Sequence, residues 1–385
     1  MKKIAVVTAT RAEYGLLSPV IRELRKQESV YLRVELIVTG THLCEKYGRT
    51  IEEISERIDH VVEIPVASDS ELDISNNQAE TLVRFTTLFI NEKYDSVILL
   101  GDRYEMLAIA IAAGNTRTPI FHICGGDTTE GALDEWIRHA ITKMSFLHFV
   151  TNEKSRNRVI QLGEDPSRVF NYGSTSIDNV LNLAYMSKDE ALASVGLSNC
   201  RYALCTYHPV TMKGGNADSQ IEELFKSIKS FPDIQFIITK SNADQGGARI
   251  NELLDKAEQE NENVHVYTSL GVRRYLSLMR YSEFVIGNSS SGIIETPSFQ
   301  VPTVNIGDRQ RGRLQAENVV NCSEESEDIV CAIRKALSVE HRVICNNVIS
   351  PYGDGHAAVR IANKAIEVTN GRIDLRKKFY DLENK

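Results

Sequence analysis

The chain lacks the features that mark membrane or secreted proteins. Among its 385 residues no apolar run approaches the ~20 residues of a membrane-spanning helix, because charged residues interrupt each run. Met1 to Lys3 lead directly into a strand-like segment, with no apolar leader core. The seven cysteines are odd in number and never spaced as Cys-x-x-Cys. We therefore expect reduced thiols in a cytoplasmic protein, and neither a disulfide frame nor a zinc site.

Signature motifs for several other function classes are also missing. The net charge is -8 and no basic tract occurs, which argues against nucleic acid as a partner. The sequence has no His-Glu-x-x-His and no calcium-binding loop, so no metal is expected. It also has neither Gly-x-Gly-x-x-Gly nor the Gly-x-x-x-x-Gly-Lys-Ser/Thr phosphate loop, which argues against nicotinamide enzymes and P-loop ATPases. We expect no cofactor.

The residues that are present predict two α/β domains. A chain of 385 residues exceeds one comfortable core, and 42% hydrophobic residues are ordinary for a globular protein. Short apolar runs alternate with amphipathic helical segments, which is typical of parallel sheets covered on both faces. The first series of expected strands is Lys3–Thr8, Arg33–Val38, Ser96–Leu100, Pro119–Cys124 and Leu147–Val150, and the second is Tyr202–Thr206, Ile234–Thr239, Val264–Tyr267, Phe284–Ile286 and Thr303–Asn305. The expected helices are Leu17–Lys26, Tyr104–Asn115, Asp134–Met144 and His356–Glu367.

This alternation predicts two doubly wound, Rossmann-like domains that face a cleft. We place the first at residues 1–184 and the second at 200–367, with a polar linker between them. The charged tail, 368–385, is expected to pack back on the first domain. In such sheets ligands bind at the carboxyl ends of the strands, where polar clusters occur repeatedly in this sequence.

The segment Gly287–Glu295 is the most informative of these clusters. Its small residues follow the apolar run Phe284–Ile286 and precede a short helical stretch, an arrangement that binds phosphate through backbone N–H groups. Glu295 follows, where its carboxylate is placed to accept the hydroxyls of a ribose. An ordinary strand–helix loop is the alternative.

Arginines are expected to supply the anion clamp. Gly307–Arg313 is the densest basic cluster, and a guanidinium binds phosphate bidentately. A solvated surface loop is the alternative. His208, held extended before Pro209 at a strand end, is a further candidate for phosphate binding, although it is one of nine histidines.

Carboxylates concentrate in the first half of the chain. Asp102 lies just beyond a predicted strand, where it can serve as a base or cap the next helix in a box with Glu105. The loop before residue 134 gathers Asp127, Glu130 and Asp134, and crowded carboxylates push each other's pKa values apart, so that one serves as acid and another as base. The only tryptophan, Trp136, is expected to pack in the core.

Taken together, these motifs resemble the UDP-N-acetylglucosamine 2-epimerases, specifically the hydrolysing branch of sialic acid synthesis. The motifs are Thr10-Arg11-Ala12-Glu13-Tyr14-Gly15, Gly101-Asp102-Arg103, Asp134-Glu135-x-Ile137-Arg138-His139, His208-Pro209, Ser241-Asn242-Ala243-Asp244, Gly287 to Ser290 with Glu295, and Gly307 to Arg313. The resemblance covers nearly the whole chain and implies the GT-B architecture, UDP as nucleotide and a homo-oligomer, a dimer or tetramer.

The resemblance also implies roles for individual residues. Asp102 and Asp134 correspond to the catalytic carboxylates, with His42 and Arg138 nearby. The nucleoside diphosphate contacts are expected from Arg11, Arg103, His208, Asn242, Leu270, Ser289, Ser290, Glu295, Arg309 and Arg313. A catalytic glutamate is expected immediately before the Gly-Gly pair, where this chain has Cys124, so Asp127 or Glu130 is expected to replace it.

The implied reaction converts UDP-N-acetylglucosamine and water to N-acetylmannosamine and UDP through a 2-acetamidoglycal. A sister group performs the same chemistry on UDP- or GDP-linked 2,4-diacetamido-2,4,6-trideoxy-glucose for legionaminic acid synthesis, and this chain is similar to it as well. A non-hydrolysing epimerase, a glycosyltransferase of the same fold and a non-catalytic sugar-nucleotide sensor remain as alternatives.

Overall fold

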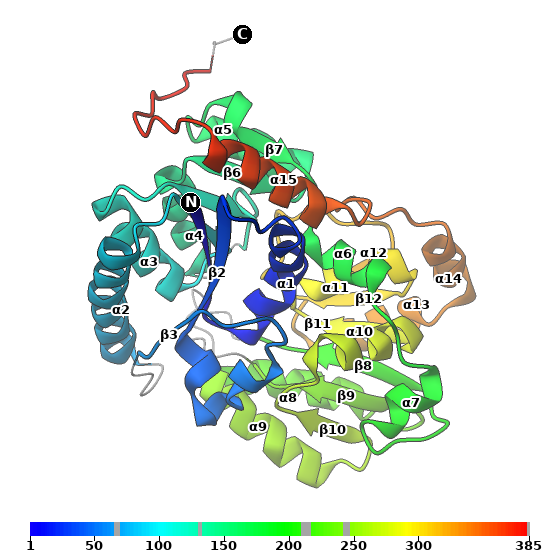
Figure 1. Cartoon of the computed structure of the whole chain (residues 1–385). Helices are drawn as coiled ribbons and strands as arrows, with labels where there is room; N and C mark the ends of the chain where they lie inside the picture. Colours follow the sequence, from blue (N-terminus) through cyan, green and yellow to red (C-terminus); the bar gives the residue numbers. More distant parts are fainter. Residues whose placement is uncertain (65–69, 130–132, 209–216, 242–246, 383–385) are drawn as a thin grey trace. The chain divides into compact units, whose positions relative to one another are not determined.

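The computed structural model describes residues 1–64, 70–129, 133–208, 217–241 and 247–382. The chain divides into two compact units. The first comprises Met1–Asp127, Asp134–Asn179 and Tyr352–Lys385, and the second comprises Thr128–Leu133 and Val180–Pro351. Each unit is built on its own parallel β-sheet (Figure 1).

The first unit contains a seven-stranded sheet in the order β3-β2-β1-β4-β5-β6-β7. All neighbouring strands run parallel. The strands are β1 (Lys2–Thr8), β2 (Leu32–Thr39), β3 (His60–Val62), β4 (Ser96–Leu100), β5 (Ile120–Ile123), β6 (Leu147–Val150) and β7 (Val169–Asn171). The helices are α1 (Arg11–Arg25), α2 (Glu71–Glu92), α3 (Tyr104–Asn115), α4 (Asp134–Met144), α5 (Glu153–Gln161) and α15 (Ala357–Asn370), while α6 (Thr175–Asn182) crosses the boundary to the second unit.

The second unit contains a six-stranded parallel sheet in the order β10-β9-β8-β11-β12-β13. Its strands are β8 (Tyr202–Thr206), β9 (Gln235–Thr239), β10 (Val264–Tyr267), β11 (Phe284–Gly287), β12 (Thr303–Ile306) and β13 (Val319–Cys322). Its helices are α7 (Lys188–Ala193), α8 (Ala217–Ile228), α9 (Gly247–Glu260), α10 (Gly271–Tyr281), α11 (Ser291–Ile294), α12 (Thr296–Phe299), α13 (Ser326–Ala336) and α14 (Val339–Asn346). The expected fold class, two doubly wound α/β domains, is therefore confirmed.

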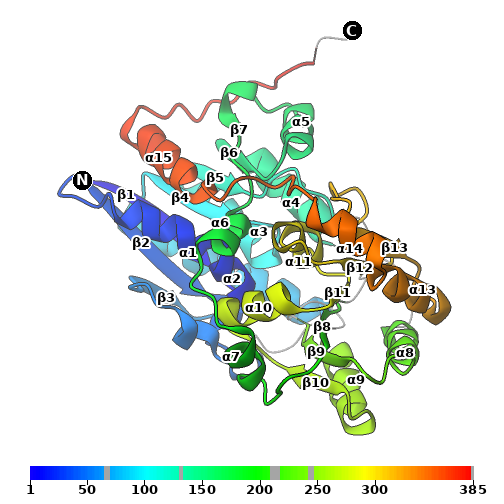
Figure 2. The same ribbon diagram turned by 90° about the vertical axis from the view of Figure 1, so that its right-hand side faces the viewer.

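Alternation along the strands divides the first sheet into two buried faces. Ile4 and Val6 of β1 pack in one hydrophobic cluster with Phe121 and Ile123 of β5 and with apolar residues of α1 and α15. Successive side chains of a strand point to opposite faces, so His122 points to the other face. Helix α15 lies beside α1, as Figure 2 shows.

Two expected boundaries are wrong. Helix α15 belongs to the first unit and not to the second, because its apolar stripe, including Ile361 and Ala365, completes the core against α1. The stretch read as a polar linker contains α7, whose Ala191 and Leu192 are buried in the core of the second unit. Short apolar segments inside polar sequence were the cause of the second error.

The segment after α15 returns across the first unit. Lys377 donates to the backbone carbonyls of Lys143 and Ser145 at the end of α4, and its ammonium lies 2.6 Å from Glu164 Oε2. The backbone N–H of Tyr380 donates to the carbonyl of Gly163. Among the described residues, no helix is both long and apolar enough to cross a membrane.

Candidate active site

Arg138 organises the candidate catalytic residues of the first unit. It lies on α4 and is only 2% exposed, although it is charged. Its guanidinium forms an ion pair with Asp102, donates to the carbonyl of Asp127 at 2.9 Å and lies 3.4 Å from Glu135 Oε2. A buried guanidinium requires such partners, because an unpaired charge in the interior is very costly. Arg138 thus joins the turn after β4, the loop after β5 and α4.

Asp102 lies in the turn after β4 and does not cap α3. The N-cap of that helix is Arg103, which makes no side-chain capping bond, so the capping box with Glu105 is wrong. Glu105 is fully buried and pairs with Arg103 at 3.2 Å. Gly101 adopts a φ of 80°, in the left-handed region that glycine tolerates, and this turn directs the chain from β4 into Asp102.

Asp127 is buried and held by hydroxyl groups. Its Oδ1 accepts hydrogen bonds from Thr151 and Ser155, each at 2.6 Å. The loop before it is tightly constrained: a Cβ on Gly126 would lie 2.4 Å from the carbonyl oxygen of Ser155. Cys124, at the position of the expected glutamate, has a φ of 65°, which is uncommon for a residue other than glycine. The replacement of that glutamate by Asp127 stays a prediction, and Glu130 lies outside the described residues.

The first turn of α4 supplies further carboxylates. Asp134 is the first residue of the helix and Glu135 the second. Glu135 Oε1 lies 3.2 Å from Nε2 of His139, one turn further along. The expectation for Trp136 is wrong: its side chain is 55% exposed, because it lies on the face of α4 opposite the buried Ile137 and Ile141.

His42 is a buried, neutral histidine with both ring nitrogens bonded. Nε2 lies 3.0 Å from Thr8 Oγ1, and Nδ1 lies 2.9 Å from Thr50 Oγ1. Burial lowers the pKa of His42 to about 4, so the ring is uncharged at neutral pH. This environment supports a structural role at the ends of β1 and β2 and gives no support to proton transfer by His42.

Glu13 is a titratable group whose significance the sequence did not reveal. It lies in the first turn of α1, which begins at Arg11. Its Oε2 accepts hydrogen bonds from the backbone N–H groups of Ala9 and Thr10 in a capping box. Burial, reinforced by the charge of Glu105, raises the pKa of Glu13 to about 7. A perturbed carboxyl at a strand end is a common feature of functional sites.

Asn288 is the centre of the polar cluster in the second unit. Its side chain accepts from the His208 N–H at 2.7 Å and donates to the His208 carbonyl at 2.8 Å. Its own carbonyl accepts from Arg309 at 3.1 Å and from Gln310 at 2.8 Å. Sequence reasoning did not single out Asn288 or Gln310, because their roles depend on contacts between separate loops.

Close backbone approach explains the glycine before this asparagine. A Cβ on Gly287 would lie 2.1 Å from the carbonyl oxygen of Thr206 on the neighbouring strand β8. Gly287 also has a φ of 131°. His208 Nδ1 in turn lies 3.3 Å from Ser241 Oγ. The ends of β8, β9 and β11 therefore meet in one buried polar cluster.

Most of the other nucleotide-site candidates lie on the second unit, whereas Arg11, the first residue of α1, and Arg103, the N-cap of α3, lie on the first unit. Ser289 and Ser290 precede α11, and Glu295 lies between α11 and α12. Tyr275 lies beside them: its hydroxyl is 2.5 Å from Ser291 Oγ, and burial, with the charge of Glu295, raises its pKa to about 12. Leu270 is buried at the start of α10, and Arg313 donates to Thr129 at 3.3 Å. Asn242 lies outside the described residues.

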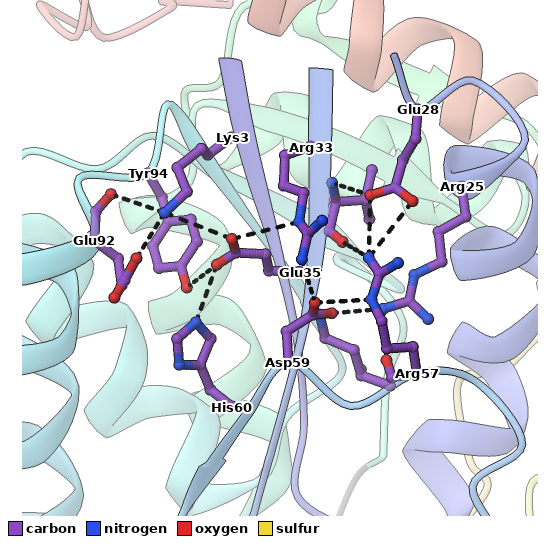
Figure 3. A network of polar contacts seen from close by, with 12 residues as sticks. Lys3, Arg25, Glu28, Arg33, Glu35, Arg57, Asp59, His60, Glu92 and Tyr94 are labelled. Carbon is purple, nitrogen blue, oxygen red and sulfur yellow. Dashed lines mark hydrogen bonds and ion pairs between the residues drawn. The ribbon is translucent and has the colours of Figure 1, made fainter. Parts of the chain in front are cut away.

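One further group has the spacing of metal ligands. Within the described part of the chain, ligand atoms of Glu35, His60 and Glu92 lie within 4.8 Å of one another. The ammonium of Lys3 lies between the two carboxylates, 2.6 Å from Glu92 Oε2 and 3.5 Å from Glu35 Oε1 (Figure 3). Lys3 thus already provides the positive charge that these carboxylates require, and this group belongs to an ion-pair network.

Comparison with known proteins extends these observations. Residues 22–366 match the family model described as UDP-N-acetylglucosamine 2-epimerase. The chain is 37% identical over 385 residues to the GDP/UDP-N,N'-diacetylbacillosamine 2-epimerase (hydrolyzing) of Campylobacter jejuni, with 99% of each chain covered. It is 38% identical over 389 residues to the polysialic acid biosynthesis protein P7 of Escherichia coli, covering 99% of this chain and 98% of that one. The structure of UDP-GlcNAc 2-epimerase from Neisseria meningitidis bound to UDP-GlcNAc has a TM-score of 0.79 at 20% identity, covering 95% of this chain and 100% of that one.

Proposed function

The chain belongs to the UDP-N-acetylglucosamine 2-epimerase family, and we propose that it is a hydrolysing 2-epimerase, which releases the free, inverted sugar from its nucleotide. The observation that carries the proposal is the ion pair between Asp102 and the buried Arg138, with the backbone carbonyl of Asp127 bound to the same guanidinium. A sensor that only binds a sugar nucleotide has no use for this arrangement of carboxylates.

The substrate is a nucleotide-linked 2-acetamido sugar. The Campylobacter relative is named for GDP- or UDP-linked N,N'-diacetylbacillosamine, which favours a 2,4-diacetamido-2,4,6-trideoxy sugar as the first candidate for this chain. UDP-N-acetylglucosamine, which would give N-acetylmannosamine, is the second candidate. Both share the acetamido group at C2, the carbon at which the reaction takes place.

The reaction begins with departure of the nucleotide. The hydrogen at C2 is not adjacent to a carbonyl, so no enzyme carboxylate removes it from the intact sugar. Loss of the diphosphate creates an oxocarbenium-like centre at C1, which makes that hydrogen acidic. We assign stabilisation of the departing diphosphate to Arg309, Arg313 and His208 on the second unit, and electrostatic stabilisation of this kind is usually the largest catalytic contribution.

Carboxylates complete the reaction at C2. Asp102 or Asp134 takes the C2 proton, which gives a 2-acetamidoglycal, and water then adds at C1 while a proton is delivered to the opposite face of C2. Each acid–base step of this kind contributes about 10²–10⁴-fold to the rate. Arg138 stabilises Asp102 as a carboxylate, which is the form that accepts a proton.

Turnover of a panel of sugar nucleotides in deuterium oxide tests this proposal. We expect free sugar and nucleoside diphosphate as products, with one deuterium at C2, observed by NMR and mass spectrometry. Release of a nucleotide-linked epimer would identify a non-hydrolysing enzyme. Turnover only with an added acceptor would identify a glycosyltransferase, and binding without turnover a sensor. Hydrogen retained at C2 in the product would exclude the elimination mechanism.

A further inference from the structure

His122 occupies the centre of the candidate catalytic region without contacting solvent. It lies on β5, and its side chain points to the sheet face opposite Phe121 and Ile123, where it is fully buried. Nε2 lies 2.7 Å from the carbonyl oxygen of Gly101, and Nδ1 lies 3.2 Å from Oγ1 of Thr142 on α4. None of the sequence motifs included this residue.

The partners of His122 determine its tautomer. A carbonyl oxygen only accepts hydrogen bonds, so the proton of the neutral ring is on Nε2, and Nδ1 accepts from the hydroxyl of Thr142. Burial lowers the pKa of His122 to about 3, and the nearby His148 and His139 act in the same direction. The ring is therefore neutral and in one tautomer near pH 7.

The two hydrogen bonds of His122 connect it to the segments that carry both partners of the Asp102–Arg138 ion pair. The Gly101 carbonyl belongs to the peptide group that leads into Asp102, and the Gly101 N–H donates to the Ile123 carbonyl at 3.0 Å. Both sides of Gly101 are thus held by β5. At the other end, Thr142 lies one helical turn beyond Arg138, so the two side chains share one face of α4. His122 therefore fixes both partners of the ion pair relative to one strand.

The loop after β5 is packed against the same two side chains. A Cβ on Gly125 would lie 2.9 Å from Thr142 Oγ1 and 3.0 Å from His122 Nδ1. Any side chain at this position would push the two bonded groups apart. The backbone that leads to Asp127 is therefore placed by contact with the His122–Thr142 pair.

We propose that His122 is a positioning residue: its neutral ring holds Asp102, Arg138 and the 125–127 loop in their catalytic arrangement. Its effect on turnover rests on the function proposed above, whereas its bonding can be tested independently. The alternative is an ordinary buried histidine that contributes only to stability. His148 is a matched example, because it is the register partner of His122 on β6, is equally buried, and bonds Glu164 away from Asp102.

The first test compares matched substitutions at the two histidines. His122→Leu removes both bonds, whereas His122→Gln keeps a donor that can reach the Gly101 carbonyl. We expect His122→Leu to lower kcat by about tenfold or more with UDP affinity changed less than about twofold, because small misplacements of reacting groups are costly. His122→Gln should recover most of the lost kcat and keep the wild-type pH profile, and His148→Leu and His148→Gln should retain kcat at temperatures at which they are folded.

Equal losses of kcat in His122→Leu and His148→Leu would overturn the proposal, as would failure of glutamine to restore activity at position 122. Loss of one limb of the pH profile in His122→Gln would show that His122 transfers protons, which also contradicts a purely positioning role. If His122→Leu does not fold, Thr142→Val removes the hydroxyl at the other end with little change in shape. We expect Thr142→Val to lower kcat by about threefold to tenfold. An unchanged kcat would count against positioning through the His122–Thr142 hydrogen bond.

The second test does not depend on the reaction. Long-range ¹H–¹⁵N NMR of the wild-type protein should show the His122 ring with its proton on Nε2 and no titration between about pH 5 and pH 9. A ring that titrates in that range, or that carries its proton on Nδ1, would overturn the proposed positioning role. If the wild-type protein turns over no sugar nucleotide, the proposed function fails while this measurement still decides the bonding of His122.

Discussion

The two ends of the strands carry charge in different ways. At the amino ends of the first sheet, charged side chains pair with one another: Lys3 lies between Glu35 and Glu92, and Asp59 accepts from three arginines within 3.0 Å (Figure 3). The second sheet repeats this on a smaller scale. Glu283, directly before β11, lies 3.2 Å from Arg342 and 3.5 Å from Arg201.

At the carboxyl ends, Arg138 also pairs with carboxylates, those of Asp102 and Glu135, and cationic and imidazole side chains in addition donate to backbone carbonyls. Arg138 donates to Asp127, His122 to Gly101, and Arg309 to Asn288. A carbonyl orients a guanidinium without cancelling its net charge, whereas a carboxylate cancels it. The amino ends carry ion-pair networks that contribute to stability, and the carboxyl ends hold oriented groups suited to a ligand and its chemistry. The following tests are chosen to separate these two uses of charge.

The largest expected difference concerns turnover. Asp102→Asn and Asp134→Asn should lower kcat by about 10² or more, because an amide can neither accept the C2 proton nor deliver a proton to C2. Glu283→Gln, a carboxylate change at an amino end, should leave kcat within about twofold, since surface ion pairs contribute little. Release of nucleoside diphosphate in a coupled assay measures all three variants. Equal losses in the three would mean that the location of a carboxylate does not decide its role.

Much of this fold could be predicted because buried parallel strands have a simple sequence signature. Ser96–Leu100 and Tyr202–Thr206 are buried at every position, so four of the five residues in each are apolar, and both were predicted with correct bounds. The edge strands β3 and β7 are three residues long and partly exposed, so their sequences carry no such run. Helix α2 was missed because polar residues such as Asn77 occupy part of its buried face.

The site was predictable to the level of segments and not of side-chain contacts. The rule that ligands bind at carboxyl ends placed Asp102 and His208 in polar clusters, and the structure shows those clusters. His122 lies inside a predicted strand and has partners 20 and 21 residues away, so neither bond leaves a local pattern. Asn288 is likewise recognisable only once β8 and β11 are paired.

A smaller but measurable effect concerns the pH dependence of stability. The pKa of His122 is about 3 in the folded protein, against an ordinary value near 6.5, so the unfolded chain binds a proton that the folded chain does not. Its contribution is fully present above pH 6.5 and is lost as pH falls, by roughly 2 kcal/mol at pH 5. Glu13 acts in the opposite direction, because its pKa is raised to about 7.

The comparison of His122→Gln with the wild type separates these contributions, since Glu13 is common to both. We expect the variant's deficit in unfolding free energy to shrink by roughly 2 kcal/mol between pH 7.5 and pH 5, measured by urea unfolding. A deficit that stays constant with pH would show that the pKa of the ring is the same in the folded and the unfolded protein.

Nucleotide affinity should change less. Arg309→Ala or Glu295→Ala should weaken UDP binding by about tenfold, near 1.4 kcal/mol, because each removes a charged group from the proposed nucleotide site. Arg342→Ala removes an arginine of the same unit at an amino end and should change affinity by less than about twofold. Calorimetric titration of UDP measures all three. An unchanged affinity in both site variants would remove Gly287–Glu295 and Gly307–Arg313 from the proposed nucleotide site.

The smallest effect is expected at the amino end of the first sheet. The side chains of Lys3 and Glu92 are 19% and 32% exposed, so water screens their ion pair. Glu92→Gln should therefore lower the free energy of unfolding by less than about 1 kcal/mol, and the loss should diminish in high salt. Urea unfolding at low and high ionic strength measures it. Turnover of Glu92→Gln should equal that of the wild type, because Glu92 pairs with Lys3 near the start of β1, whereas Asp102 follows the end of β4. A substantial loss of kcat in a fully folded Glu92→Gln protein would show that the two ends of the sheet are coupled.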